Sequence, residues 1–349
     1  MNKIKKLTIM VVFVFVLFIT ISCSQKNNKE FTFEAWNQSD SLNSLKQYVS
    51  DTTSEGSNKF IPKEDRIAVF DMDGTLYGEL FPEYLEYLML EYRVLDDPTY
   101  NASEELKEVG MQIRESGKTY STPNISGYDL IHANAAAKAY AGMTVNEFTN
   151  YTKEFLKKDV KCFKNMTYKE AFYKPMIEVV TYLQQNDFTT YVVSGSDRFL
   201  CRALVCDTLN IPESQVIGMD VKLEGTSQNG KSGLDYQFLN TDELVRTDEL
   251  VIKNLKMNKV ALIAKEIGKQ PVISFGNSSG DISMHVYTTT KNKYESKAYM
   301  LVADDTIRDH AKIEEANKRQ KMWNEYGFNI ISMKNDFKTI YGEKVEIIN

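Results

Sequence analysis

The chain has 349 residues, a formal net charge of −6 at pH 7 and 42% hydrophobic residues. This length is long for one compact domain and fits one large core that carries a sizeable insertion. The acidic balance excludes the broad basic surface of a nucleic-acid-binding protein, so no nucleic-acid partner is predicted. An acidic chain that acts on an anionic substrate must gather its positive charge locally, through a metal ion and one or two lysines.

The N-terminal segment has the pattern of an export signal. Three lysines among the first six residues precede an apolar run over residues 7–21, and Ser22-Cys23 follow it. This is typical of a secretory signal peptide, and the run is short for a membrane span, which needs about 20 residues. The end of the run resembles the lipobox of bacterial lipoproteins, with Thr20 as a less usual occupant.

The lipobox resemblance implies a signal peptide over residues 1–23 that ends at a lipidated Cys23. The protein would then lie outside the cytoplasm, held by its lipid at a bacterial membrane, on the periplasmic side or at the cell surface. An ordinary cleaved signal peptide and an uncleaved anchor helix are the alternatives. No oligomeric state is predicted.

Strand and helix patterns alternate beyond a tether and an amphipathic helix, which occupy residues 24–60. The predicted strands are short apolar runs, at residues 66–70, 188–193, 216–219, 272–275 and 298–302. A β-hairpin is expected at residues 220–240, a helix at residues 259–267, and a mostly helical tail from residue 305. This alternation predicts an α/β fold with a parallel sheet. The helical block at residues 79–186 interrupts the rhythm, so we interpret it as a cap inserted into a core of residues 61–78 and 187–349.

Cysteine and histidine usage gives no pattern of a zinc site or a disulfide scaffold. Cys162, Cys201 and Cys206 have no metal-ligand spacing, and the three histidines are scattered. We therefore expect buried thiols at these positions rather than a bridge.

The first predicted strand ends in Asp71-Met72-Asp73-Gly74-Thr75, at the sheet edge where open α/β folds place their chemistry. Asp71 at the strand tip can attack phosphorus and form an aspartyl-phosphate. A carboxylate is a weak nucleophile, so the phosphoryl charge must first be neutralised, which Mg²⁺ held by oxygen ligands achieves. Asp73 can protonate the leaving oxygen and later deprotonate water. The alternative is a strand followed by an ordinary acidic turn.

Two further strand ends carry polar loops that would return to the same edge. Ser194-Gly195-Ser196 opens a predicted helix, where a hydroxyl and backbone N–H groups can hold a phosphate. Asn277 and Asp281 follow the strand at residues 272–275 and offer oxygen ligands for a hard cation. Lys259 can balance the cluster, with Lys253 and Lys256 as rivals. Each loop alone is also compatible with a generic turn.

In this order the loops resemble the motifs of the haloacid dehalogenase superfamily. The resemblance implies a Rossmann-like core, a magnesium cofactor and a C1-type cap, as in the branch similar to phosphoserine phosphatase and phosphorylcholine phosphatase. It assigns Asp71 as the nucleophile and Asp73 as the general acid and base. Ser194 and Lys259 are the other implied catalytic residues, and Thr75 and Gly195 are implied to bind the substrate. The implied metal ligands are Asp71, Asp73, Asn277 and Asp281.

The resemblance implies hydrolysis of a small phosphomonoester, with a phosphoserine- or phosphocholine-like substrate. Glu79, beside the aromatic Tyr77 and Phe81, could bind a cationic head group, or could simply begin the first cap helix. Asn277 departs from the family, which has a metal-binding aspartate there, so the metal would be held with less charge. The alternatives are another phosphotransfer reaction of the superfamily and a non-catalytic or weakly catalytic surface lipoprotein that binds its ligand on this fold.

Overall fold

The computed structural model describes residues 31–79 and 83–348. Residues 33–349 form one compact unit, which contains every element considered below. The predicted signal peptide, Cys23 and Phe81 lie outside the described residues. Within the described part, no helix is both long and apolar enough to cross a membrane.

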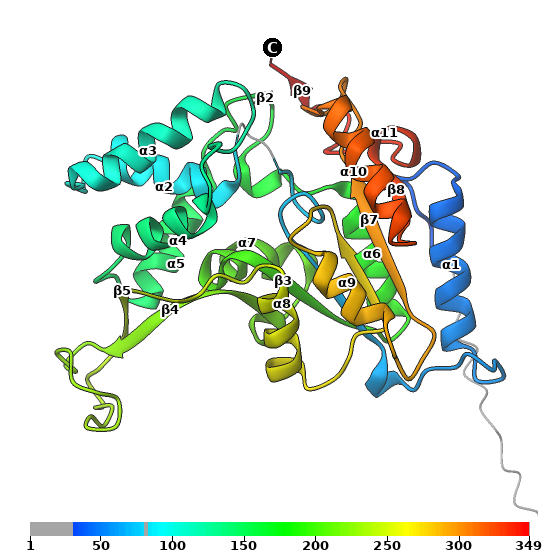
Figure 1. Ribbon diagram of the computed structural model, residues 1–349, viewed down its shortest axis with the longest axis horizontal. Coiled ribbons are helices and arrows are strands. Elements are labelled where there is room, and N and C mark those ends of the chain that lie inside the picture. Colours follow the sequence, from blue (N-terminus) through cyan, green and yellow to red (C-terminus); the bar gives the residue numbers. More distant parts are fainter. Residues whose placement is uncertain (1–30, 80–82, 349) are drawn as a thin grey trace, which may run out of the picture. The chain divides into compact units, whose positions relative to one another are not determined.

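The core is a seven-stranded sheet in the order β5-β4-β3-β1-β6-β7-β8 (Figure 1). All neighbouring strands run parallel except β4 and β5, which are antiparallel. The strands are β1 (Ile67–Phe70), β3 (Thr189–Asp197), β4 (Val216–Gly225), β5 (Leu244–Ile252), β6 (Ile273–Gly276), β7 (Lys297–Val302) and β8 (Asn329–Ser332). The predicted α/β fold with a mostly parallel sheet is therefore confirmed. The tail was predicted to be mostly helical, but the apolar run within it forms β8 and extends the sheet.

Side chains of β1 alternate between two cores because successive strand residues face opposite sides of a sheet. Ala68 and Phe70 belong to the larger core. It is covered by α1 (Asp40–Thr53), α6 (Lys174–Gln185) and α7 (Arg198–Leu209). Ile67 and Val69 pack on the other face against α8 (Met257–Leu262), its π-helical continuation Ile263–Ile267 and α9 (Ile282–Thr289). Buried on both faces, β1 is held firmly, and Asp71 directly follows it.

The remaining core elements come from the C-terminal part of the chain. Helix α10 (Ile313–Glu325) packs on the same face as α9, with Trp323 fully buried against β7. The short helix α11 (Met333–Asp336) follows β8. The last strand, β9 (Glu346–Ile347), pairs with β2 (Phe163–Lys164) instead of joining the main sheet. The C-terminal segment thus contacts both the core and the inserted segment.

Four helices form the cap: α2 (Leu85–Leu95), α3 (Glu104–Gly117), α4 (Tyr128–Ala139) and α5 (Val145–Phe155) (Figure 1). A capping box of Thr144 and Glu147 fixes the start of α5. The predicted cap range of residues 79–186 extends too far, because α6 contacts β3 and α7 rather than the cap helices. Helical periodicity alone could not separate a cap helix from a crossover helix of the core. Cys201 and Cys206 are free thiols, and Cys162 and Cys201 are buried.

The predicted hairpin is larger than the sequence indicated. Its strands are β4 and β5, joined by residues 226–243. The backbone of Arg246 in β5 pairs with the cap, accepting a hydrogen bond from Gly142 N at 2.8 Å and donating one to Met143 O at 2.9 Å. The hairpin therefore joins the core sheet to the cap in addition to the covalent connections.

Candidate active site

The centre of the site is an ion-pair cluster at the carboxyl ends of β1 and β6. Lys259 Nζ lies 2.6 Å from Asp71 Oδ1 and 2.6 Å from Asp281 Oδ1. The lysine side chain is only 1% exposed. Thr75 Oγ1 donates to the second oxygen of Asp71 at 3.3 Å. Lys259, rather than Lys253 or Lys256, is therefore the lysine that lies beside Asp71.

The ammonium group of Lys259 faces the carboxylates of Asp71 and Asp281, and the pKa values of the two carboxylates shift in opposite directions. Burial and then the charge of Asp281 raise the pKa of Asp71 to about 7, although Lys259 opposes this shift. Burial would lower the pKa of Lys259, but the charges of Asp281 and Asp71 raise it above its ordinary value. The pKa of Asp281 is lowered despite its burial, chiefly by Lys259. Lys259 therefore stays charged and Asp281 stays ionised at neutral pH.

Asp73 lies beside Ser196, which follows β3. Ser196 Oγ donates to Asp73 Oδ2 at 2.9 Å, while the buried Asp73 Oδ1 has no hydrogen-bond partner among the described residues. Burial and then the charge of Asp71 raise the pKa of Asp73 to about 8, and the bond from Ser196 opposes the shift. At neutral pH Asp73 is therefore largely protonated, with one oxygen uncommitted.

The two serines of the Ser194-Gly195-Ser196 loop have different surroundings. Ser194 is fully buried beneath the loop, and its hydroxyl accepts a hydrogen bond from Ser196 N at 3.0 Å. Ser196 and Gly195 line the cavity described below, and Ser194 does not. The predicted loop therefore reaches the cavity, but the hydroxyl that lies beside Asp73 belongs to Ser196 and not to Ser194.

Asn277 offers an oxygen that suits a metal ion. Its buried Oδ1 has no partner among the described residues, and its side chain packs against Gly74. A Cβ atom added to Gly74 would lie 1.9 Å from Asn277 Nδ2, and the φ of +80° also favours glycine there. Asn277 and Asp71 line the same cavity, so oxygen donors of the type that Mg²⁺ prefers meet at this point.

Asp281, which was predicted to be a metal ligand, has both carboxylate oxygens in hydrogen bonds within the protein. Its Oδ1 accepts from Lys259, and its Oδ2 accepts from the backbone N–H groups of Asn277 at 3.1 Å and Ser278 at 3.0 Å. Asp281 thus fixes the loop and orients Lys259. Consistent with an amide at position 277, the described residues contain no group of three or more histidine, cysteine, aspartate or glutamate side chains that could hold a metal.

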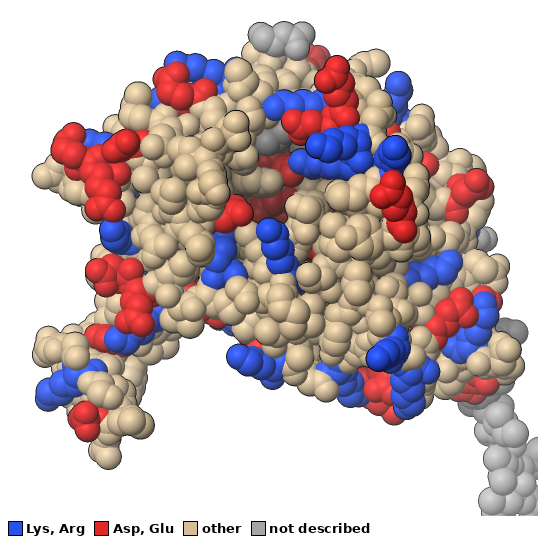
Figure 2. Space-filling view, in the orientation of Figure 1, with Lys and Arg blue, Asp and Glu red and all other residues tan. Residues whose placement is uncertain are grey.

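Asp71, Asp73, Ser196 and Asn277 line a cavity of about 350 Å³ between the core, the cap and α10. Figure 2 shows a hollow with acidic side chains at its floor and basic side chains around its mouth. The charged and aromatic residues that line it are Asp71, Asp73, Tyr84, Glu86, Tyr87, Asp129, Lys253, Lys256 and Arg319. The volume suits a small ligand.

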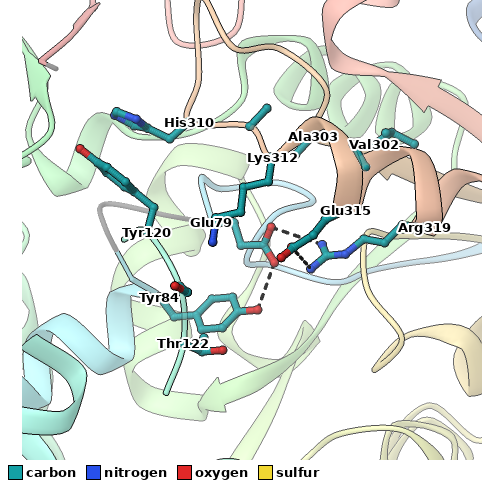
Figure 3. Close-up of a pocket in the computed structure, with 13 residues that line it drawn as sticks. Glu79, Tyr84, Tyr120, Thr122, Val302, Ala303, His310, Lys312, Glu315 and Arg319 are labelled. Carbon is teal, nitrogen blue, oxygen red and sulfur yellow. Dashed lines mark hydrogen bonds and ion pairs between the residues drawn. The ribbon is translucent and has the colours of Figure 1, made fainter. Parts of the chain in front are cut away.

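A second cavity, of about 130 Å³, adjoins the first and shares Tyr84 and Arg319 with it. Glu79 lies in this second cavity (Figure 3) and not in the first, which is called the catalytic cavity below. Its Oε1 accepts from Tyr84 Oη at 3.0 Å, and its Oε2 lies 3.8 Å from Arg319 Nη1. The expected role of Glu79 with a cationic head group is therefore not supported, because Arg319 and Lys312 line the same cavity.

Residues 68–285 match the family model of haloacid dehalogenase-like hydrolases. The chain belongs to this family. A protein of unknown function from Anaerococcus prevotii DSM 20548 is similar in structure, with a TM-score of 0.53 and 14% identity over 86% of this chain and 95% of that one. At this identity the likeness supports the fold alone.

Two other solved structures are similar to parts of the haloacid dehalogenase-like chain at lower scores. A phosphoserine phosphohydrolase-like protein from Francisella tularensis subsp. tularensis SCHU S4 has 17% identity and a TM-score of 0.42, covering 76% of this chain and 94% of that one. Cytosolic 5'-nucleotidase IIIB bound to cytidine has 13% identity and a TM-score of 0.48, covering 82% of this chain and 83% of that one. Comparison with curated proteins gives no match.

Sequence reasoning missed the residues that reach the cavity from distant segments. Glu86 of α2 pairs with Lys253 at 3.2 Å and accepts from Asp197 N at 2.8 Å, and Arg319 comes from α10. Neither Glu86 nor Arg319 follows a core strand, and helical periodicity does not show which polar side chain faces a cavity. Ser196 had a signal, since it stands in the predicted phosphate-binding loop.

Proposed function

We propose that the protein is a magnesium-dependent phosphatase that hydrolyses a small phosphomonoester through an aspartyl-phosphate on Asp71. The observation that carries the proposal is the convergence of Asp71 and the Asp73–Ser196 pair on one cavity at the sheet edge, with Lys259 bound directly to Asp71. Asp71 supplies a nucleophile, Lys259 supplies a fixed positive charge for phosphoryl oxygens, and Asp73 supplies a proton.

In the first step an oxygen of Asp71 forms a bond to phosphorus while the bond to the leaving oxygen breaks. Asp73 donates its proton to that oxygen, so the alcohol leaves neutral. In the second step Asp73 takes a proton from water, which attacks phosphorus, and the bond to Asp71 breaks to release phosphate. Burial raises the pKa of Asp73 to about 8, which keeps the proton of this acid available at neutral pH.

The donor set fits Mg²⁺, which would neutralise phosphoryl charge and orient the substrate when bound. Asp71, the backbone carbonyl of Asp73 and Asn277 would hold it. The uncommitted Oδ1 of Asn277 supports this assignment. Asp281, which accepts hydrogen bonds from Lys259 and from the backbone of its own loop, would hold Lys259 and Asn277 in place beside the ion. With an amide at position 277, we expect the magnesium affinity to be low for the family.

Hydrolysis of p-nitrophenyl phosphate by the purified full-length chain in detergent tests the proposal, in Mg²⁺ and after EDTA treatment. We expect Mg²⁺-dependent turnover that Asp71→Asn lowers by at least about a thousandfold. Asp40→Asn, which changes an exposed carboxylate at the start of α1, is the matched control and should leave the rate unchanged. Turnover that survives Asp71→Asn removes the assigned nucleophile. Absence of turnover on a broad panel of esters would favour the non-catalytic binding protein.

We also propose that lipid on Cys23 anchors the enzyme outside the cytoplasm. The basic start, the apolar run and Ser22-Cys23 support this assignment. In a bacterial expression host supplied with radiolabelled palmitate, the full-length chain should incorporate label and fractionate with membranes, and Cys23→Ser should abolish the labelling. Labelling that persists in Cys23→Ser would contradict the assignment.

A further inference from the structure

Most charged groups of the two cavities already have close partners. Lys259 holds Asp71 at 2.6 Å, and Lys253 holds Glu86 at 3.2 Å. Glu86 also accepts a backbone hydrogen bond at 2.8 Å from Asp197 N. These pairs fix the floor and one wall of the catalytic cavity, and their charges are balanced within the protein. The part of a substrate beyond its phosphoryl group must therefore be recognised by the charged groups that remain.

Arg319 is a cation that remains. It lies at the junction of the two cavities, on α10, and points toward Glu79 and Glu315 (Figure 3). Its guanidinium nitrogens lie 3.8 Å from Glu79 Oε2 and 3.9 Å from Glu315 Oε2. Both distances exceed hydrogen-bond length. Within the part of the chain that the structure describes, Arg319 forms no hydrogen bond.

Other arginines of the molecule make short bonds to carboxylates. Arg198 lies 2.7 Å from Asp220, and Arg246 lies 2.7 Å from Asp197. A guanidinium group carries five N–H donors in a planar fork that fits carboxylate and phosphate oxygens. With its side chain 37% exposed, Arg319 can direct these donors toward a ligand in the cavity.

Two lysines add positive charge around Arg319. Lys312 lines the second cavity and Lys256 lines the catalytic cavity, and neither forms an ion pair with a described residue. On the acidic side, Asp129 accepts a hydrogen bond from Tyr87 Oη at 3.4 Å. Glu79 and Glu315 also line the path between the two cavities, but both lie beyond hydrogen-bond length from Arg319.

We propose that Arg319 binds a second anionic group, a carboxylate or a phosphate, on the leaving alcohol of the substrate. The inference rests on the proposed phosphatase function and narrows its substrate class to phosphomonoesters with a second negative charge. The scissile phosphoryl group would lie at Asp71, and the distal anion would lie at the junction beside Tyr84. Because α10 lies outside residues 68–285, which match the family model, this recognition depends on the C-terminal segment of the chain.

Two substrate pairs test the proposal, each matched except for the second charge: glycerol 3-phosphate with 3-phosphoglycerate, and fructose 6-phosphate with fructose 1,6-bisphosphate. The first pair reports a carboxylate and the second a phosphate. In one of the two pairs, the full-length wild type should have a kcat/KM at least about tenfold higher for the member that carries the second negative group. Arg319→Ala should lower that kcat/KM by about 10- to 100-fold, mainly through a higher KM. For the member without the second negative group, its kcat/KM should stay within about threefold of the wild-type value.

Arg319→Lys should retain part of the preference, because it keeps the charge and loses the fork. Lys318→Ala, an exposed cation on the same helix that lines neither cavity, should behave as wild type. The proposal would be overturned if Arg319→Ala lowered kcat/KM equally for both members of a pair. It would also be overturned if the wild type preferred the members without the second negative group.

Binding to a catalytically inert background separates this proposal from failure of the phosphatase assignment. Calorimetry should show that Asp71→Asn binds 3-phosphoglycerate or fructose 1,6-bisphosphate. The double variant, which carries Arg319→Ala in addition, should bind the same ligand at least about tenfold more weakly. If the wild type hydrolyses no ester but this difference persists, anion recognition by Arg319 stands and the phosphatase function fails. If both proteins bind alike, or neither binds, the role of Arg319 is refuted.

Discussion

Replacement of Lys259 by methionine tests the physical basis of the site, because methionine keeps most of the apolar stem and removes only the charge. Lys259 makes two contacts of 2.6 Å, to Asp71 and Asp281, with its side chain 1% exposed. Removing one partner from a buried ion pair costs about 3–5 kcal/mol, because an unpaired charge stays buried. The whole domain is expected to be stable by about 5–15 kcal/mol. We therefore expect Lys259→Met to remove a large share of the free energy of unfolding at pH 8.5.

The pH dependence of this loss has a definite sign. The pKa of Asp71 is raised from 3.8 in the ordinary state to about 7 in the folded state, so its protonated form stabilises the fold at low pH, and this contribution is lost as pH rises toward 7. Without Lys259 the pKa of Asp71 rises further, and the variant continues to lose stability above pH 7 where the wild type levels off. The difference between the two proteins should grow by about 1.4 kcal/mol for each pH unit above 7.

Urea unfolding in EDTA, followed by tryptophan fluorescence, measures this difference at pH 6 and pH 8.5. Both tryptophans, Trp36 and Trp323, are buried and report loss of the core. Lys157→Met, at an exposed lysine paired with Glu154, is the control and should leave the midpoint unchanged. A variant within about 1 kcal/mol of wild type at pH 8.5, or a difference that shrinks as pH rises, would refute the buried-charge reasoning.

Four further changes have expected outcomes. Asn277→Asp should tighten Mg²⁺ binding by about 10- to 100-fold in calorimetry and lower the Tm of the metal-free protein; unchanged affinity would remove Asn277 from the metal site. Gly74→Ala should lower both Tm and turnover, because its Cβ would lie 1.9 Å from Asn277 Nδ2, and a fully active variant would contradict this packing. Burial raises the pKa of Asp309 to about 7, so the stability that its protonated form provides is lost between about pH 4 and pH 7. Asp309→Asn should therefore raise Tm more at pH 8 than at pH 5. A larger rise at pH 5 would refute this assignment. Arg246→Met should lower Tm by leaving the buried Asp197 unpaired, and Asp197→Asn added to it should restore part of the loss; no restoration would indicate that lost packing against Phe148 dominates.

The sequence predicted the core better than the insertions, for a physical reason. A buried parallel strand is a continuous apolar run such as residues 67–70, and this signal is local. The cap boundary was wrong at α6 because an amphipathic helix gives the same periodicity whether it covers a cap or a sheet. The strand at Asn329–Ser332 was missed within a tail dominated by helical patterns. Such assignments depend on which surface an element packs against, and that is decided by tertiary contacts.

The candidate site divides in the same way. Asp71, Asp73 and Asn277 follow strands of a parallel sheet, so their meeting at one edge could be predicted from the order of the strands alone. Lys259 also lies where its position before the β6 strand suggested. Ser194 was the predicted hydroxyl, and Ser196 is the one that lies beside Asp73. This difference depends on how the loop turns, which the residue types alone do not specify. The cavity wall made by Arg319 depends on the return of the chain after β7, and nothing local in the sequence marks it.

The charge balance of the site connects its departure from the family pattern with its stability. Asp71 and Asp281 together carry two negative charges when ionised, Lys259 carries one positive charge, and Asp73 is largely protonated at neutral pH. An aspartate at position 277 would add a further buried negative charge within the same cavity, and without a bound cation nothing described at that point would offset it. Asn277 keeps the oxygen and omits the charge. The metal-free protein thereby avoids repulsion at the sheet edge, and the cost is a weaker attraction for the cation that the proposed reaction requires.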